Sequence, residues 1–141
     1  MPSEHNKFNL NTTTQQELTG YHIPPTKKTP EVFLSKEKGL LIINGRSIPT
    51  RANDFYFPVM RKIEEYIKNP QEHTKAVFNL EYLDSASSKL LLAVIMRLRT
   101  VSEDNSLEID WYYTEDDHDM MELGRMFSQL TGCKMNFRIA K

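Results

Sequence analysis

The sequence predicts an α/β fold in which a mixed β-sheet of about five strands packs against about three helices. Three observations support this fold class. Segments with the two-residue apolar alternation of strands take turns with segments whose apolar residues recur every three to four positions, as in helices. The 141 residues are enough for one domain and little more. Hydrophobic residues make up 39% of the chain, which supplies a core without disulfide bonds.

The first twenty residues differ in composition from the rest of the chain. They are polar and of low complexity, and Phe8, Leu10 and Leu18 are too sparse to form a core element. We expect residues 1–20 to be a flexible tail and residues 21–141 to be a single domain. A short amphipathic docking segment is the alternative for the tail. Three prolines between positions 24 and 30 favour an extended lead-in to the fold.

Five segments have the pattern of strands. The first two are joined by a hairpin turn at residues 36–39, after which residues 45–49 are expected to leave the sheet as a loop. The clearest strand is the central one, which alternates apolar residues with others up to Leu83. The five expected strands are 31–35, 39–44, 76–83, 107–113 and 135–139.

Three helices are expected between these strands, over residues 54–68, over residues 87–101, and from a capping box at Thr114 and Asp117 to about Leu130. In the first helix, Pro58 is expected to be tolerated because it falls in the first turn, where backbone amides lack helical partners. Gly132 is expected to cap the third helix. The predicted order is therefore β-β-α-β-α-β-α-β, and right-handed crossovers would make the middle strands parallel.

Composition excludes several functional classes. The formal net charge of −1 argues against binding nucleic acid through a broad basic face. Cys133 is the only cysteine, so no internal disulfide can form. The longest apolar run, residues 90–96, is far too short for membrane insertion, and the N-terminus lacks the pattern of a signal peptide. We therefore expect a cytoplasmic protein.

The sequence predicts no metal site and no cofactor. The histidines at positions 5, 22, 73 and 118 lack a second His or Cys at ligand spacing, and the five glycines do not form a phosphate-binding loop. The densest acidic run, residues 115–119, has two interpretations. It is either a divalent-cation site or a solvated helix N-terminus whose carboxylates complement the helix dipole, and the dipole favours the second.

Residues 83–89 join the central strand to the most apolar helix and contain three serines and a lysine. Asp and Ser are favoured helix caps, so capping is expected here. A Ser/Lys nucleophile pair is a second possibility, although Ala86 occupies the position three before Lys89 where an S-x-x-K motif needs serine. A phosphoacceptor is the third, because a helix N-terminus accommodates an anion. In that case phosphorylation would change the charge of a binding surface by about −2.

Five short motifs follow one another along the chain. They are Ile23, Thr26, Thr29 and Pro30; Gly45 to Pro49; Phe55 to Pro58; Tyr82 to Lys89; and Trp111 and Tyr113 followed by the acidic residues 115–117. In this order they resemble the SiaC-type biofilm-regulation phosphoproteins, whose fold is close to the STAS domain, and the resemblance covers about residues 21–141. Two of the motifs depart from the family pattern: Ile48 replaces a tyrosine, and Asp84-Ser85 replaces an Asn-Thr pair.

This resemblance implies a non-enzymatic regulatory phosphoprotein of a bacterial partner-switching system. A GHKL-type Ser/Thr kinase would phosphorylate Ser85, a PP2C-type phosphatase would reverse this, and the unphosphorylated form would bind and activate a diguanylate cyclase. Asp84, Ser85, Ser87, Ser88 and Lys89 would form the partner-binding surface.

Three alternatives remain at this stage. The Asp84-Ser85 pair is similar to the site of sporulation-type anti-sigma-factor antagonists, STAS proteins that are switched by serine phosphorylation, so the target is open. A small hydrolase would use Ser85 or Ser88 as nucleophile. A structural or ligand-binding domain would use Ser85 only as a cap. Of the neighbouring aromatic residues Tyr56 and Phe57, one is expected in the core and the other is available for contacts.

Overall fold

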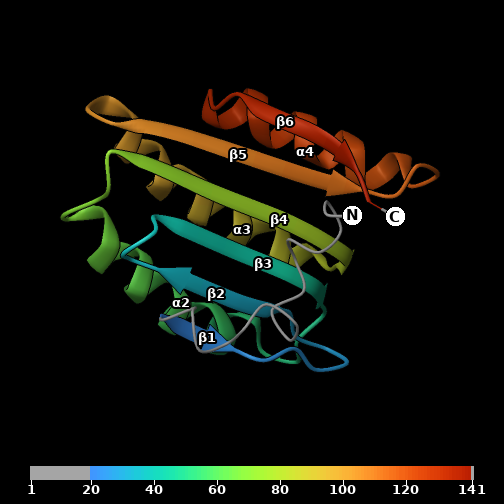
Figure 1. Cartoon of the computed structure of the whole chain (residues 1–141). Helices are drawn as coiled ribbons and strands as arrows, with labels where there is room; N and C mark the ends of the chain where they lie inside the picture. Colours follow the sequence, from blue (N-terminus) through green and yellow to red (C-terminus); the bar gives the residue numbers. More distant parts are fainter. Residues whose placement is uncertain (1–19, 141) are drawn as a thin grey trace, which may run out of the picture.

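The computed structural model describes residues 20–140, so the predicted tail lies outside the described residues. These residues form one six-stranded sheet in which the order of the strands in space follows their order in the chain (Figure 1). The strands are β1 (Tyr21–Ile23), β2 (Glu31–Ser35), β3 (Leu40–Ser47), β4 (His73–Leu83), β5 (Ser106–Tyr113) and β6 (Met135–Ile139).

The sheet is mixed, and the expected mixed α/β class is confirmed. β1, β2 and β3 pair antiparallel, whereas β3, β4, β5 and β6 pair parallel. Helices α2 (Ala52–Ile67), α3 (Ser85–Arg99) and α4 (His118–Thr131) connect the parallel strands and cover one face of the sheet (Figure 1). A short 3-10 helix, η1 (Thr100–Glu103), extends α3. This arrangement follows from right-handed crossovers that all step in the same direction.

The main core lies between the sheet and the helices. It takes alternate residues from the strands, such as Ile43, Phe78 and Trp111, and the buried stripe of α3 around Leu91 and Ile95. The opposite face of the sheet, which we call the helix-free face, carries a second and smaller apolar cluster. Among the described residues, no helix is long and apolar enough to cross a membrane.

The largest differences from the predicted strands concern β1 and β3; in addition, β4 begins at His73 rather than at residue 76, and β5 begins at Ser106 rather than at residue 107. The prediction missed β1, which has only three residues and pairs with β2. The predicted loop at residues 45–49 was wrong for its first part, because β3 continues to Ser47. A register shift between Gly45 and Arg46 lets β3 bend and keep its pairing with β4, and Gly45 adopts a positive φ of 124° there.

The helices begin earlier or later than predicted. Because α2 starts at Ala52, Pro58 lies in its second turn rather than its first. Proline has no amide hydrogen, so one backbone carbonyl of the helix lacks its hydrogen-bond donor. Pro58 is exposed, so water can hydrate that carbonyl. α3 begins at Ser85 because Asp84 caps it. In α4 the cap is Asp117 and not Thr114.

Only some of the apolar residues of α4 face the core. Met120 and Phe127 are buried, whereas Leu130 is 59% exposed. Gly132 ends the helix with a φ of 76°, which confirms the predicted glycine cap.

α4 packs closely against β5 in the core. The indole Nε1 of Trp111 donates a hydrogen bond to the carbonyl of Met120 at 2.9 Å, and Trp111 is only 1% exposed. A Cβ added to Gly124 would lie 2.6 Å from this indole ring and 2.9 Å from the ring of Phe137. The hydrogen bond fixes the indole, so Gly124 is required for the close approach of α4 to the sheet.

We predict that Gly124→Ala lowers the free energy of unfolding by about 1–3 kcal/mol, because the added methyl overpacks the core. In an ordinary helix the same change would raise stability by up to about 1 kcal/mol. Urea unfolding followed by the fluorescence of Trp111, the only tryptophan, measures the effect. Gln129→Ala, at an exposed position of the same helix, is the control and should change little; a Gly124→Ala protein as stable as the original would contradict the packing argument.

Candidate functional site

The segment that the sequence singles out lies where β3 and β4 end side by side. The two strands are parallel, and Ser47, the last residue of β3, pairs with Leu83, the last residue of β4. The amide of Asp84 then donates a hydrogen bond to the carbonyl of Ser47 at 3.0 Å. The carboxyl ends of parallel strands are the usual place for functional sites in α/β proteins.

Asp84 is the N-cap of α3. Its backbone is extended, and its Oδ1 accepts a hydrogen bond from the amide of Ser87 at 2.8 Å. Its carbonyl accepts from the amide of Ser88 at 2.9 Å. The bond from Ser87 satisfies one of the amides that a helix N-terminus leaves without helical partners, and the bond from Ser88 is the first hydrogen bond of the helix itself. Ser85 is therefore the first residue of the helix, and its side chain is exposed.

Three buried hydroxyl groups lie beneath this turn and join three elements. The Oγ of Ser47 in β3 lies 2.6 Å from the hydroxyl of Tyr56 in α2, and it donates to the Oγ of Ser87 in α3 at 2.8 Å. The solvent-exposed fraction of each of the three residues is 0%. Burial raises the pKa of Tyr56 to about 12, although the hydrogen bonds with Ser47 and Ser87 offset part of this effect. The hydroxyl chain therefore stays neutral at physiological pH and fixes the start of α3.

The five predicted site residues divide by exposure. Ser85 and Lys89 are exposed, and Asp84 and Ser88 are half-buried. Ser87 departs from the prediction: its hydroxyl is buried against Ser47 and does not lie on the surface. Ser87 therefore shapes the turn from beneath instead of contacting a partner. Its role depends on residues far away in the chain, which the local pattern cannot reveal.

The lead-in loop of residues 24–30 is also bound to this end of the sheet. Oγ1 of Thr26 accepts hydrogen bonds from the amides of Lys28 and Thr29, at 3.1 and 2.9 Å, which closes the loop on itself. The carbonyl of Lys28 accepts from the amide of Ile48 at 2.8 Å, one residue after Ser47. Four of the five motifs that carry the resemblance are thus joined at the carboxyl ends of β3 and β4.

Large apolar side chains are exposed on the same segments. Ile48 is 38% exposed, Phe57 56% and Tyr82 53%, whereas Tyr56 is the core aromatic of its pair. The guanidinium of Arg46 lies 5.0 Å above the ring of Tyr82, which holds that ring at the surface. The sequence analysis did not identify Ile48 and Tyr82 as exposed residues of this site. Ile48 could have been identified, because it occupies the position where the family pattern has a tyrosine.

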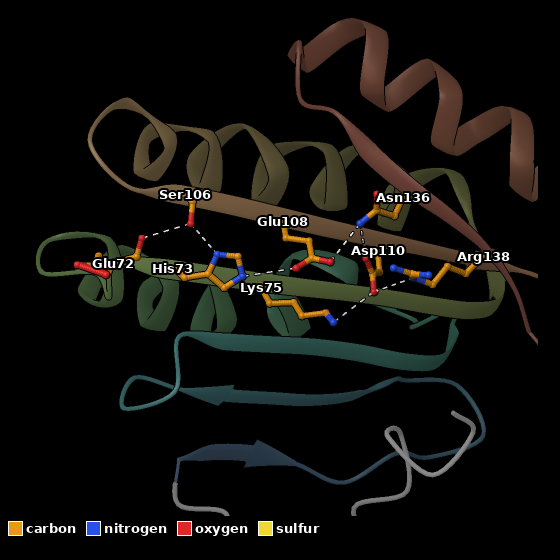
Figure 2. Close-up of polar contacts among 8 residues, drawn as sticks. All are labelled: Glu72, His73, Lys75, Ser106, Glu108, Asp110, Asn136 and Arg138. Atoms are coloured by element: carbon orange, nitrogen blue, oxygen red, sulfur yellow. Dashed lines mark hydrogen bonds and ion pairs between the residues drawn. The ribbon is translucent and has the colours of Figure 1, made fainter. Parts of the chain in front are cut away.

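A second polar group lies apart from this site, on the helix-free face (Figure 2). Its centre is Asp110, which is fully buried and bound by Arg138 at 3.0 Å, Asn136 at 3.0 Å and Lys75 at 3.5 Å. Burial alone would raise the pKa of Asp110, but the hydrogen bonds and the two cations outweigh it and hold the pKa below its usual value. His73 extends the group by contacts with Ser106 and Glu108.

Neither region contains a set of described side chains that could ligate a metal ion. Within residues 20–140, no group of three or more His, Cys, Asp or Glu side chains could hold a metal ion. In the acidic run of residues 115–119, Asp117 accepts the amide of Met120 at 3.0 Å as the cap of α4. This contact agrees with the second interpretation of the acidic run, a helix N-terminus whose carboxylates complement the helix dipole.

Comparison with known proteins decides the family. The SiaC family of regulatory phosphoproteins matches residues 23–140, which is most of the chain. The chain belongs to the SiaC family. This family consists of regulatory phosphoproteins, which supports a regulatory role rather than catalysis. The hydrolase alternative therefore receives no support.

This chain is similar to a relative and to solved structures from Pseudomonas aeruginosa. An uncharacterized protein of that species is 23% identical over 123 residues, which are 86% of this chain and 96% of the relative. A chain in the crystal structure of the diguanylate cyclase SiaD in complex with its activator SiaC matches with a TM-score of 0.79 at 21% identity, over 85% of this chain and 99% of that one. Apo-SiaC matches with a TM-score of 0.74 at 23% identity, over 88% of this chain and 100% of that one. The SiaC fold is therefore shared.

We predict that alkaline pH destabilises the protein through Tyr56. Unfolded tyrosine loses its proton near pH 10, whereas folded Tyr56 keeps it until about pH 12. Its contribution to stability is thus complete below pH 10 and is lost between pH 10 and 12, by about 3 kcal/mol in total. Urea unfolding at pH 9 and pH 11 measures the loss.

The Tyr56→Phe protein should lose less stability than the original over this pH range. Tyr82→Phe, which removes an exposed phenol, is the matched control and should keep the original dependence. The same pH dependence in the original and the Tyr56→Phe protein would show that the Tyr56 hydroxyl is not held in its buried, protonated state.

Proposed function

We propose that this SiaC-family protein is a partner switch controlled by phosphorylation of Ser85. A GHKL-type Ser/Thr kinase adds the phosphate and a PP2C-type phosphatase removes it. The unphosphorylated form binds a signalling partner in the cytoplasm, and that partner is a diguanylate cyclase. Residues 21–141 form the switching domain.

The exposure of Ser85 is the observation that carries the proposal. Of the hydroxyls at this end of the sheet, those of Ser47, Tyr56 and Ser87 are buried and hydrogen-bonded to one another. Ser85 projects from the first position of α3, where a kinase can reach it. A buried hydroxyl would require local unfolding before phosphate transfer, so exposure is the first requirement of the proposed acceptor.

Phosphate at Ser85 would act by electrostatics at the start of α3. The helix N-terminus favours an added anion, so the domain stays folded. The neighbouring carboxylate of Asp84 already occupies the cap position and accepts the amide of Ser87. A dianion beside it adds like charge, which repels acidic partner groups and disfavours burial of this surface in a complex.

The surface that binds the partner would combine Ser85 and Lys89 with the exposed apolar residues Ile48, Phe57 and Tyr82. Exposed aromatic residues next to charged ones are typical of protein interfaces. The diguanylate cyclase is favoured by the structural likeness to SiaC, which activates SiaD. The Asp84-Ser85 pair favours an anti-sigma factor as the second candidate target.

We predict that a cognate GHKL-type kinase with ATP adds one phosphate to the protein, and that intact-protein mass spectrometry followed by peptide mapping places it on Ser85. Ser85→Ala should abolish the addition. Ser88→Ala, three residues further along the helix, is the matched control and should still be phosphorylated. Phosphate mapped to another residue would refute the assignment of Ser85.

We predict that Ser85→Asp prevents binding to the cyclase while the fold survives, because the added charge imitates the phosphorylated state. Ser85→Ala should bind like the original, and Phe57→Ala should bind about tenfold or more weakly, as an aromatic contact residue does. Calorimetric titration measures affinity and circular dichroism checks the fold. Equal affinity of the Ser85→Asp and Ser85→Ala proteins would refute charge control.

A further inference from the structure

The two edges of the sheet differ in how they are protected. β1, at one edge, has only three residues and is followed directly by Pro24 and Pro25. Short edge strands and prolines are common features that stop an edge from pairing with another chain. β6, at the other edge, has five residues, contains neither proline nor glycine, and keeps an unbroken register with β5. Within residues 20–140, β6 pairs only with β5, so its other side is an open edge.

The backbone groups on the open side of β6 belong to residues with apolar side chains. The amide of Ala140 donates to the carbonyl of Tyr113 at 2.8 Å and therefore points towards β5. Successive residues of a strand direct their N–H and C=O groups to opposite sides, so those of Met135, Phe137 and Ile139 point away from the sheet. The side chains of these three residues share the helix-bearing face. Met135 is buried there, whereas Phe137 is 38% and Ile139 51% exposed.

The polar side chains of β6 turn away from the open edge, towards β5 (Figure 2). Arg138 is the only charged residue of β6, and its Nε binds the carboxylate of Asp110 at 3.0 Å. The amide group of Asn136 donates to Asp110 at 3.0 Å and to Glu108 at 3.1 Å. A charged side chain often protects an edge strand from pairing, but the charge of Arg138 is neutralised by the neighbouring strand. The open edge of β6 thus combines outward backbone groups with exposed apolar side chains.

We propose that β6 pairs antiparallel with β6 of a second copy of this chain, so that the two sheets join into one. A two-fold axis at Phe137 places this residue opposite its own equivalent and places Met135 opposite Ile139 of the other copy. The outward backbone groups of these pairs then exchange about six hydrogen bonds. On the opposite face, Asn136 lies across from Arg138, so neither arginine faces the other directly.

The pattern of β6 favours a second copy over an unrelated strand. From Met135 to Ile139 the strand alternates apolar and polar residues, and the alternation is the same when it is read in the reverse direction. An antiparallel copy therefore places apolar residues opposite apolar ones along the whole strand. A two-fold axis perpendicular to the sheet also keeps α4 of both copies on the same face, where the exposed surfaces of Phe137 and Ile139 meet and are buried.

The proposal is independent of the switch at Ser85. The turn that carries Ser85 lies at the carboxyl ends of β3 and β4, which are separated from β6 by β5. Because the strands of the two copies run in opposite directions, the two Ser85 turns lie at opposite edges of the joined sheet. Each turn remains accessible in the dimer.

The mass of the full chain in solution tests the dimer. By sedimentation equilibrium between about 1 and 200 µM, we expect the mass to rise from 16.5 kDa towards twice that value. Ile139→Lys places a charge in the joined sheet, and Ile139→Pro removes an outward amide that a single copy does not use. Each should weaken the dimer about tenfold or more. Met96→Lys on α3, which is 40% exposed, adds the same charge elsewhere and should dimerise like the original. Circular dichroism establishes that each protein is folded.

Disulfide formation tests the register. In a Cys133→Ala background, Phe137→Cys leaves one cysteine in the chain, so any disulfide joins two chains. The proposed pairing brings the two Cα atoms at position 137 to about 5.5 Å, which suits a disulfide. Ile139→Cys in the same background is the matched control, because its equivalent in the other copy is about 13 Å away along the strand. We expect the disulfide to form about tenfold faster for Phe137→Cys.

Three results would overturn the proposal. The first is a mass of one chain at every concentration. The second is a dimer that neither Ile139→Lys nor Ile139→Pro weakens, because its interface would lie elsewhere. The third is a disulfide that forms as fast for Ile139→Cys as for Phe137→Cys, because the antiparallel register centred on Phe137 would then be wrong. None of these results affects the assignment of Ser85, which is tested by phosphorylation.

Discussion

The hydrogen bonds of Ser47 are the interaction on which the candidate site depends. Its side chain joins α2 to α3 through Tyr56 and Ser87, and its carbonyl receives the amide of Asp84. One residue therefore ties the end of β3 to both neighbouring helices and to the turn that carries Ser85. The hydroxyls of Ser47, Tyr56 and Ser87 are buried and would be costly to leave without partners, so the turn has one well-defined conformation. The exposed hydroxyl is held on a rigid support.

Much of this fold is predictable from local patterns, because apolar alternation and turn residues act over short distances. The strands Glu31–Ser35 and Met135–Ile139 have the predicted bounds, and the Asp84 cap follows from residue preference. Where prediction fails, pairing between distant segments has decided the outcome. Gly45 to Ser47 have the composition of a loop but pair with β4, and the burial of Ser87 depends on Ser47, forty residues away.

The two faces of the sheet differ in their chemistry, and the candidate site lies on neither of them but at the carboxyl ends of β3 and β4. The helix-bearing face is closed by the apolar stripes of three helices, and the opposite face combines an apolar row with the ion-paired Asp110. The exposed hydroxyl of Ser85 lies instead at the start of α3, beside the carboxyl ends of β3 and β4. A chain that is only 21–23% identical to solved structures of this fold can keep the fold, since apolar periodicity tolerates substitution.

The spatial order of the strands, which repeats their order along the chain, affects how the protein forms. Each strand pairs only with the strands made just before and just after it, and the loops to be closed are a hairpin or a single helical crossover. The sheet can therefore grow from β1 towards β6 while the chain leaves the ribosome, because no strand has to wait for a distant partner. The edge left open at each stage is the one that the next segment fills. Synthesis and assembly thus proceed in the same direction.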